Sequence, residues 1–321
     1  MGNRKGDNLK MEIKIPEQQL GINKNKSMWK IWYRQLRPHT LTAAFVPVSI
    51  GSALALLDGH ANILLFLAML LASILIQAAT NLFNEYYDYK RGLDTEESIG
   101  IGGGIVRDGI APKTILNVAL SFFAIAILLG VYICASSSWW IAAIGIVCMF
   151  TAYFYTGGPY PIAYSPFGEI VSGFFMGVVI ILISYFIQTD SISLESFLIS
   201  IPISILIGAI MLSNNIRDLD GDKESGRRTL AILLGREKAI KLLAAMFTVS
   251  YAWVIILMVM GIVSPWLLIV FGSLPKAMKA VQGFKGKTLP IQMMPAMKAT
   301  AQTNTIFGFL VAAGLLLSYW V

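Results

Sequence analysis

Two acidic clusters in the sequence have the residue types and spacing of a metal-assisted site. In the first, Asn84 and Asp88 are four residues apart, so they share one face of a helix. Gly92 then allows the chain to leave that helix, and Asp94 can fold back toward the same point. The cluster therefore predicts three oxygen-bearing side chains at one helix end.

The second cluster repeats this spacing. Asp218 and Asp222 are again four residues apart, whereas Asp220 points to another face. Carboxylates on one face repel each other and favour a bound cation, and Mg²⁺ is typically held by one or two carboxylates together with substrate phosphates. Basic side chains lie among both clusters and are expected to contact a diphosphate directly; they are Lys90, Arg91, Arg217, Lys223, Arg227 and Arg228.

The elements that must position these clusters are membrane helices. The chain has 321 residues, of which 56% are hydrophobic and only 13% charged, whereas soluble proteins carry about 25% charged residues. This composition excludes an ordinary soluble enzyme. Long apolar blocks of about 20 residues predict an all-α bundle of nine transmembrane helices: 40–57, 61–83, 115–135, 138–156, 168–188, 196–216, 238–260, 263–279 and 300–320. The eighth contains Gly272 and Pro275 and is expected to be a tilted or broken helix.

The basic residues predict the orientation of this bundle. With nine spans, all 25 Lys and Arg residues fall on one side, which is then the cytoplasmic side. Residues 1–27 are predicted to form a flexible cytoplasmic tail, and 28–321 the transmembrane domain. Because the positive charge is explained by membrane orientation, a nucleic-acid partner is not expected. Both acidic clusters lie at cytoplasmic helix ends, after the second and sixth spans, so they are expected to form one site.

These motifs resemble a known family. Asn84-x3-Asp88-x5-Asp94 together with Asp218-x3-Asp222 is similar to the paired aspartate-rich motifs of the UbiA superfamily of intramembrane aromatic prenyltransferases. Three further stretches, at 37–41, 155–161 and 214–231, resemble the branch of that superfamily that uses 1,4-dihydroxy-2-naphthoate in menaquinone biosynthesis. The resemblance extends from about Arg37 to the C-terminus and includes the nine-helix count.

The resemblance implies an activity and roles for individual residues. Two Mg²⁺ ions, held by Asn84, Asp88, Asp94, Asp218 and Asp222, would neutralise the diphosphate of a polyprenyl diphosphate and assist its departure. The prenyl group would pass to a ring carbon of 1,4-dihydroxy-2-naphthoate, with loss of CO₂. Asp88, Asp218 and Asp222 would act in catalysis, and Tyr155 would shield the allylic cation. Glu169 is a candidate general base. The menaquinone assignment places the protein in a bacterial plasma membrane.

The chain departs from the superfamily pattern at two places. Glu85 occupies a position that is often Asp in relatives, so its role as a metal ligand is open. The loop at 155–167 has no lysine where some relatives have a Tyr-x3-Lys motif. The glycine-rich segment Gly102 to Gly104 is either a lid over the substrates or a simple connection.

Three alternatives remain at this point. The acceptor could be another aromatic compound, such as 4-hydroxybenzoate or homogentisate, although the stretch at 214–231 argues against it. A transporter would also need many spans, but charged residues at mid-membrane depth are missing from the predicted helices. A non-catalytic prenyl-binding scaffold would not need this many carboxylates. Cys134 and Cys148 lie in apolar runs and predict neither a disulfide framework nor a metal site, and the pattern carries no signal for the oligomeric state.

Overall fold

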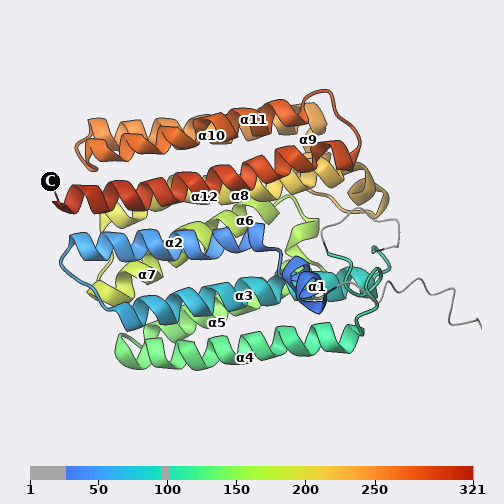
Figure 1. Cartoon of the computed structure of the whole chain (residues 1–321), viewed down its shortest axis with the longest axis horizontal. Coiled ribbons are helices and arrows are strands. Elements are labelled where there is room, and N and C mark those ends of the chain that lie inside the picture. Colours follow the sequence, from blue (N-terminus) through green and yellow to red (C-terminus); the bar gives the residue numbers. More distant parts are fainter. Residues whose placement is uncertain (1–26, 95–101, 321) are drawn as a thin grey trace, which may run out of the picture.

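The computed structural model describes residues 27–94 and 102–320 (Figure 1). The predicted cytoplasmic tail lies almost entirely outside the described residues. Within the described ranges the chain forms helices and no strands, so the all-α prediction is confirmed. The helices are α1 (Met28–Gln35), α2 (Pro38–Leu57), α3 (Ile63–Lys90), α4 (Pro112–Ser136), α5 (Trp140–Thr156), η1 (Ile162–Tyr164), α6 (Gly168–Gly173), η2 (Phe174–Val179), α7 (Ile180–Thr189), α8 (Leu194–Glu224), α9 (Leu230–Leu234), α10 (Arg236–Val259), η3 (Pro265–Ser273), α11 (Leu274–Phe284) and α12 (Pro290–Trp320).

Seven helical segments of the described chain are long and apolar enough to cross a membrane, so the protein is a multi-pass membrane protein. Each corresponds to one of the nine predicted spans; the segment Gly168–Thr189 runs through α6, η2 and α7 without a break. The long helices lie side by side in one bundle (Figure 1).

The predicted count of nine spans is not confirmed. The fourth is α5, which has 17 residues and therefore extends only about 26 Å, because the Gly157, Gly158 and Pro159 turn ends it. The eighth is divided into the 3₁₀ helix η3 and the short helix α11. Pro265 and Pro275 stand at the starts of these two pieces, where a missing backbone N–H does least harm.

Among the helices that are longer than predicted, α3 and α8 carry the acidic clusters. The second and sixth predicted spans end at residues 83 and 216, but α3 continues to Lys90 and α8 to Glu224. With 28 and 31 residues they are about 42 and 46 Å long, against a hydrocarbon core of about 30 Å. Helix-breaking glycines with positive φ come at Gly92, after Asn84 and Asp88, and at Gly226, after Asp218 and Asp222. These four residues therefore lie on helical extensions, whereas Asp94 follows the turn at Gly92.

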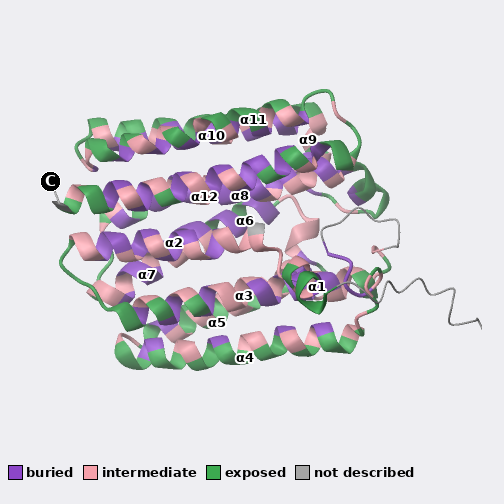
Figure 2. Ribbon diagram, in the orientation of Figure 1, coloured by how far each residue is buried: buried purple, intermediate pink, exposed green. Residues whose placement is uncertain are grey.

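Tight packing around α2 holds the bundle together. A Cβ atom on Gly51 would lie 2.4 Å from the Ile181 carbonyl oxygen of α7, and one on Gly308 of α12 would lie 2.0 Å from a Val46 methyl group of α2. Small residues at such crossings let membrane helices approach closely. The outer faces of α4 and α10 are largely exposed (Figure 2), and on α4 they carry apolar side chains such as Leu120, Ile125 and Leu128. These are faces suited to lipid.

Candidate active site

One large cavity runs through the bundle and contains both acidic clusters in its wall. Its volume is about 830 Å³, and it is lined by α2 to α8 together with the segments that follow α3 and α8. Along α3 the lining extends from Met69 to Asp88, a distance of about 28 Å. The end away from the clusters is apolar and includes both cysteines, Cys134 and Cys148, which are unpaired. The cavity thus joins a charged end to a long apolar section.

The first cluster faces this cavity from the end of α3. Asn84, Asp88 and Asp94 all line it. After α3 the chain turns at Gly92, whose φ is +71°, and the Leu93 amide donates to the Asp88 carbonyl 3.0 Å away. This turn brings Asp94 back to the cavity. Burial, and then the charges of Glu85 and Asp88, raise the pKa of Asp94 to about 6. A bound cation would relieve this repulsion.

The second cluster faces the same cavity from the end of α8. Asp218 and Asp222 line it, whereas Asp220 does not. The Asp220 side chain is 69% exposed and forms an ion pair with Arg236 at 2.8 Å. The helical spacing therefore separates the three aspartates as predicted from the sequence.

Arg227 connects the two clusters. One of its nitrogens lies 3.3 Å from an Asp88 carboxylate oxygen, and the other lies 3.0 Å from an Asp222 oxygen. Its guanidinium also stacks over the Tyr164 ring, 4.2 Å from the ring centre, and the Tyr164 hydroxyl donates to Asp88 at 3.2 Å. Carboxylates that are 134 residues apart in the sequence are thus held at one point by a single cation.

The other five predicted phosphate-binding cations are placed differently. Arg217 lines the cavity and forms a bidentate pair with Asp218 at 2.6 and 2.5 Å. Arg91 lies beside the cavity, where it donates to the Thr156 and Gly158 carbonyls at 2.8 Å each. The remaining three are exposed and do not line the cavity: Lys90, Lys223 and Arg228.

Glu85 has a structural partner rather than a free carboxylate. It is 1% exposed and accepts hydrogen bonds from the Gly103 amide at 2.8 and 2.9 Å and from the Ile105 amide at 3.2 Å. A Cβ atom on Gly102 would lie 2.0 Å from a Glu85 oxygen, so the glycine is required for this approach. The described part of the glycine-rich segment is therefore anchored to α3, and the longer side chain at position 85 reaches its backbone.

Tyr155 and Glu169 lie near each other on α5 and α6. Tyr155 lines the cavity, and its hydroxyl donates to the Gly168 carbonyl at 3.3 Å. Glu169 is buried behind this wall and does not line the cavity. One of its oxygens accepts from the Asn215 amide at 2.8 Å, and the other has no hydrogen-bond partner in the described part of the chain. Asn215 itself lines the cavity.

Comparison with known proteins identifies the family. The model of the UbiA prenyltransferase family matches residues 44–289. The chain belongs to this family. It is 62% identical to "1,4-dihydroxy-2-naphthoate octaprenyltransferase" of Bacillus subtilis over 92% of this chain and 95% of that protein. It is 26% identical to the protein of the same name from Escherichia coli, over 92% and 97% of the two chains.

Solved structures share the fold of this prenyltransferase. A UbiA homolog from Archaeoglobus fulgidus bound to GPP and Mg²⁺ matches with a TM-score of 0.61 at 19% identity, over 88% of this chain and 99% of that one. The apo structure of a UbiA homolog from Aeropyrum pernix K1 matches with a TM-score of 0.63 at 14% identity, over 88% and 98%. At these identities the likeness shows the fold alone.

The charged end of the cavity fits a divalent cation that is shared with a substrate. Its donors are carboxylate and amide oxygens, which are the ligands that Mg²⁺ prefers. Among the described residues, no three His, Cys, Asp or Glu side chains stand close enough to hold a metal by themselves. This donor set suits an ion that binds one or two carboxylates and completes its coordination with phosphate oxygens and water.

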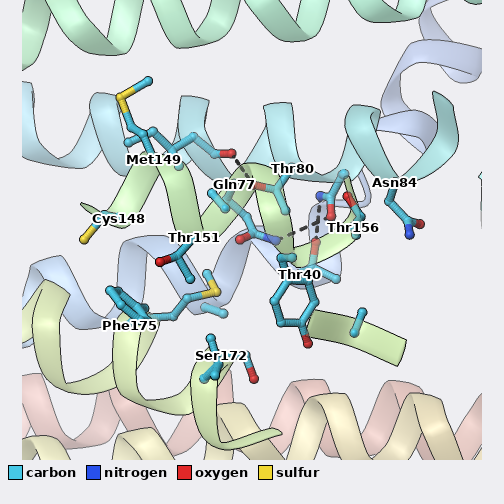
Figure 3. Close-up of a pocket in the computed structure, with 18 of the residues that line it drawn as sticks. Thr40, Gln77, Thr80, Asn84, Cys148, Met149, Thr151, Thr156, Ser172 and Phe175 are labelled. Carbon is cyan, nitrogen blue, oxygen red and sulfur yellow. Dashed lines mark hydrogen bonds between the residues drawn. The ribbon is translucent and has the colours of Figure 1, made fainter. Parts of the chain in front are cut away.

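Sequence reasoning missed a cation at the charged end of the cavity and the polar residues in its middle. Arg37, which immediately precedes α2, lines the cavity at the end that holds Asp88 and Asp94 and has a positive φ of 49°. Polar side chains of α3, among them Gln77 and Thr80, line it within the hydrocarbon part of the helix (Figure 3). Gln77, Thr80 and Asn84 are three and four residues apart on α3. This spacing could have indicated a polar lining, because uncharged polar side chains inside an apolar span need partners.

Proposed function

We propose that this protein transfers a polyprenyl group from a polyprenyl diphosphate to 1,4-dihydroxy-2-naphthoate in an Mg²⁺-dependent reaction of menaquinone biosynthesis. The observation that carries the proposal is the 62% identity, over nearly the whole length of both chains, to a protein named for this activity. The cavity supports it because it joins a site for a diphosphate to an apolar section long enough for an isoprenoid chain.

The charged end would bind the diphosphate. Asn84, Asp88, Asp94, Asp218 and Asp222 would hold Mg²⁺, which supplies charge neutralisation for the departing diphosphate. Arg217 and Arg227 line the cavity beside these carboxylates, and each has N–H groups in the planar arrangement that suits phosphate oxygens. Arg91 would support this end from outside through its contacts with the loop after α5.

The proposed reaction does not require a proton to be removed from a ring carbon. The allylic C–O bond breaks with both electrons going to diphosphate, and the ring carbon that carries the carboxylate forms the new C–C bond. The C–CO₂ bond then breaks, and its electron pair restores the aromatic ring. The product is demethylmenaquinone in its hydroquinone form. A base at the reacting carbon is not needed, which agrees with the position of Glu169 behind the cavity wall.

The walls of the cavity would protect the allylic cation from water. Tyr155 lines the cavity close to the charged end and offers an aromatic face. Apolar residues of α4 and α5 such as Ile127, Ile146 and Met149 would surround the prenyl chain. The distribution of Lys and Arg supports a charged end on the cytoplasmic side of a plasma membrane.

An assay with purified, detergent-solubilised protein tests the proposal. The protein is incubated with a polyprenyl diphosphate, Mg²⁺ and, in separate reactions, 1,4-dihydroxy-2-naphthoate, 4-hydroxybenzoate and homogentisate, and the products are identified by mass. We expect demethylmenaquinone with the first acceptor only, and its loss when a chelator is added. Product with either of the other acceptors instead would overturn the assignment, and product in the presence of chelator would overturn the role of Mg²⁺.

A further inference from the structure

A polar band crosses the cavity between its charged end and its apolar section. On α3, Gln77, Asn84 and Asp88 are separated by seven and four residues and therefore share one helix face. Thr80 and Asn81 lie between them, and Thr40 of α2 packs against this face of α3, where it is hydrogen-bonded to Asn81 (Figure 3). Thr40, Thr80 and Asn81 are hydrogen-bonded within the protein. Gln77 remains available to a ligand other than the isoprenoid chain.

Hydrogen bonds fix the orientation of this band, starting from Thr40. The Thr40 hydroxyl donates its only proton to the Arg37 carbonyl at 2.9 Å, so its oxygen can only accept from Asn81. The Asn81 amide nitrogen donates to Thr40 and to the Leu36 carbonyl, both at 2.9 Å. The Asn81 amide oxygen is therefore the atom that faces Gln77.

This orientation determines what Gln77 presents to the cavity. Its Nε2 donates to the Asn81 oxygen at 3.4 Å, so its Oε1 points away from Asn81. Among the described residues no group donates to that oxygen, although Gln77 lines the cavity. This oxygen is therefore an acceptor that is open to the cavity and lacks a donor from the described residues. A ligand hydroxyl can supply that donor.

The distance along α3 fits an acceptor ring at this position. Gln77 lies eleven residues from Asp88, which is about 16 Å along the helix axis. A diphosphate bound at Asp88, the allylic carbon attached to it and a bicyclic ring in contact with that carbon span a distance of this order. The far hydroxyl of the ring then reaches the level of Gln77.

From this geometry we infer that Gln77 Oε1 accepts a hydrogen bond from a ring hydroxyl of the aromatic acceptor and selects dihydroxy over monohydroxy rings. The inference rests on the proposed function and names a residue that recognises the aromatic acceptor. Gln77 is a specificity-determining residue here, and it holds the ring in one orientation. Loss of one neutral hydrogen bond weakens binding by up to about tenfold.

The test compares acceptor analogues in wild type and in Gln77→Leu. Competition against 1,4-dihydroxy-2-naphthoate gives the inhibition constants of 1-hydroxy-2-naphthoate and 4-hydroxy-2-naphthoate, each of which lacks one hydroxyl. In wild type, the analogue that lacks the hydroxyl bound by Gln77 should bind about tenfold more weakly than the dihydroxy acceptor. In Gln77→Leu this preference should fall below about twofold, and the KM for the polyprenyl diphosphate should be unchanged.

Controls separate a binding effect from a folding effect. Gln77→Met keeps the length of the side chain and should behave like Gln77→Leu, so the test survives if one variant is unstable. Gln188→Leu removes a glutamine of α7 that lies outside the cavity and bonds to Asn62, and it should keep the wild-type preference. Two outcomes would overturn the inference but not the proposed function. Either both Gln77 variants keep the wild-type acceptor preference, or their KM for the polyprenyl diphosphate rises as much as acceptor binding weakens. Absence of prenylated naphthoate in wild type would overturn the proposed function and the inference together.

Discussion

The two acidic helix ends have the same spacing but differ in how their charges are balanced. At the end of α8, Asp218 is paired with its neighbour Arg217 and Asp222 with Arg227. At the end of α3, Asp88 shares Arg227 with Asp222, and Asp94 forms no ion pair with any described residue. The α3 end thus has a cavity-lining carboxylate without a paired cation, whereas both cavity-lining carboxylates of the α8 end are paired. We therefore expect a metal cation to be bound more strongly through the α3 end, whereas the α8 end also offers arginines to a phosphate.

The largest effect is expected from removing the cavity-facing aspartates. Asp88→Ala, Asp218→Ala and Asp222→Ala should each lower kcat/KM by about 10³-fold or more, because each removes a charge that holds the cation at the developing negative charge. Asp220→Ala is the matched control and should change kcat/KM by less than about threefold, since Asp220 faces Arg236. Steady-state rates at varied polyprenyl diphosphate concentration measure kcat/KM for all four variants, and an equal loss at Asp220 would contradict the helical-face argument.

Replacing Arg227, which links the two acidic helix ends, should have the next largest effect on kcat/KM. Arg227→Gln should reduce kcat/KM by about 10²-fold, since it removes a cation bonded to both clusters and available to the diphosphate. Arg228→Gln is the control, because Arg228 is the adjacent residue in sequence but is exposed and outside the cavity. Steady-state rates with varied donor distinguish the two variants. Similar losses in both would mean that net charge near the membrane surface matters more than the bridge.

A Glu85 variant tests whether this carboxylate at the α3 end is structural or a metal ligand. Glu85→Gln weakens its bonds to the Gly103 and Ile105 amides and should lower the free energy of unfolding by about 1–3 kcal/mol. Thermal unfolding in detergent measures this loss. The Mg²⁺ concentration for half-maximal activity should stay within about twofold of wild type. A large increase in that concentration would instead identify Glu85 as a ligand.

The smallest effects are expected at the three exposed cations. Lys90→Gln, Lys223→Gln and Arg228→Gln should each change kcat/KM by less than about threefold at physiological salt, because exposed charges are screened by solvent and ions. The donor KM is the appropriate measurement. A tenfold rise at any of them would show that the diphosphate extends beyond the cavity described by the structure.

The sequence predicted the parts of this molecule that depend on local spacing. Helical periodicity placed Asp218 and Asp222 apart from Asp220, and long apolar blocks located the helices. It also placed Asn84 and Asp88 on a helix that the chain leaves at Gly92. The predicted membrane spans nevertheless stopped at residues 83 and 216, because hydropathy does not mark where a helix ends once its residues become polar. Nor did the sequence predict the partners of Glu85 and Arg227, since both bonds join segments far apart in the chain. The division of the eighth span at Pro275 was visible as a break, but its 3₁₀ geometry was not.

The length of α3 and α8 also has an electrical consequence. Both helices exceed a hydrocarbon core of about 30 Å, and their acidic clusters lie together at one end. Moving one elementary charge across a membrane costs about 2.3 kcal/mol per 100 mV. In the proposed function the diphosphate binds and leaves at that same end, so the reaction would carry almost no charge through the transmembrane field. Turnover should therefore proceed at the same rate in an energised membrane as in one whose potential has collapsed.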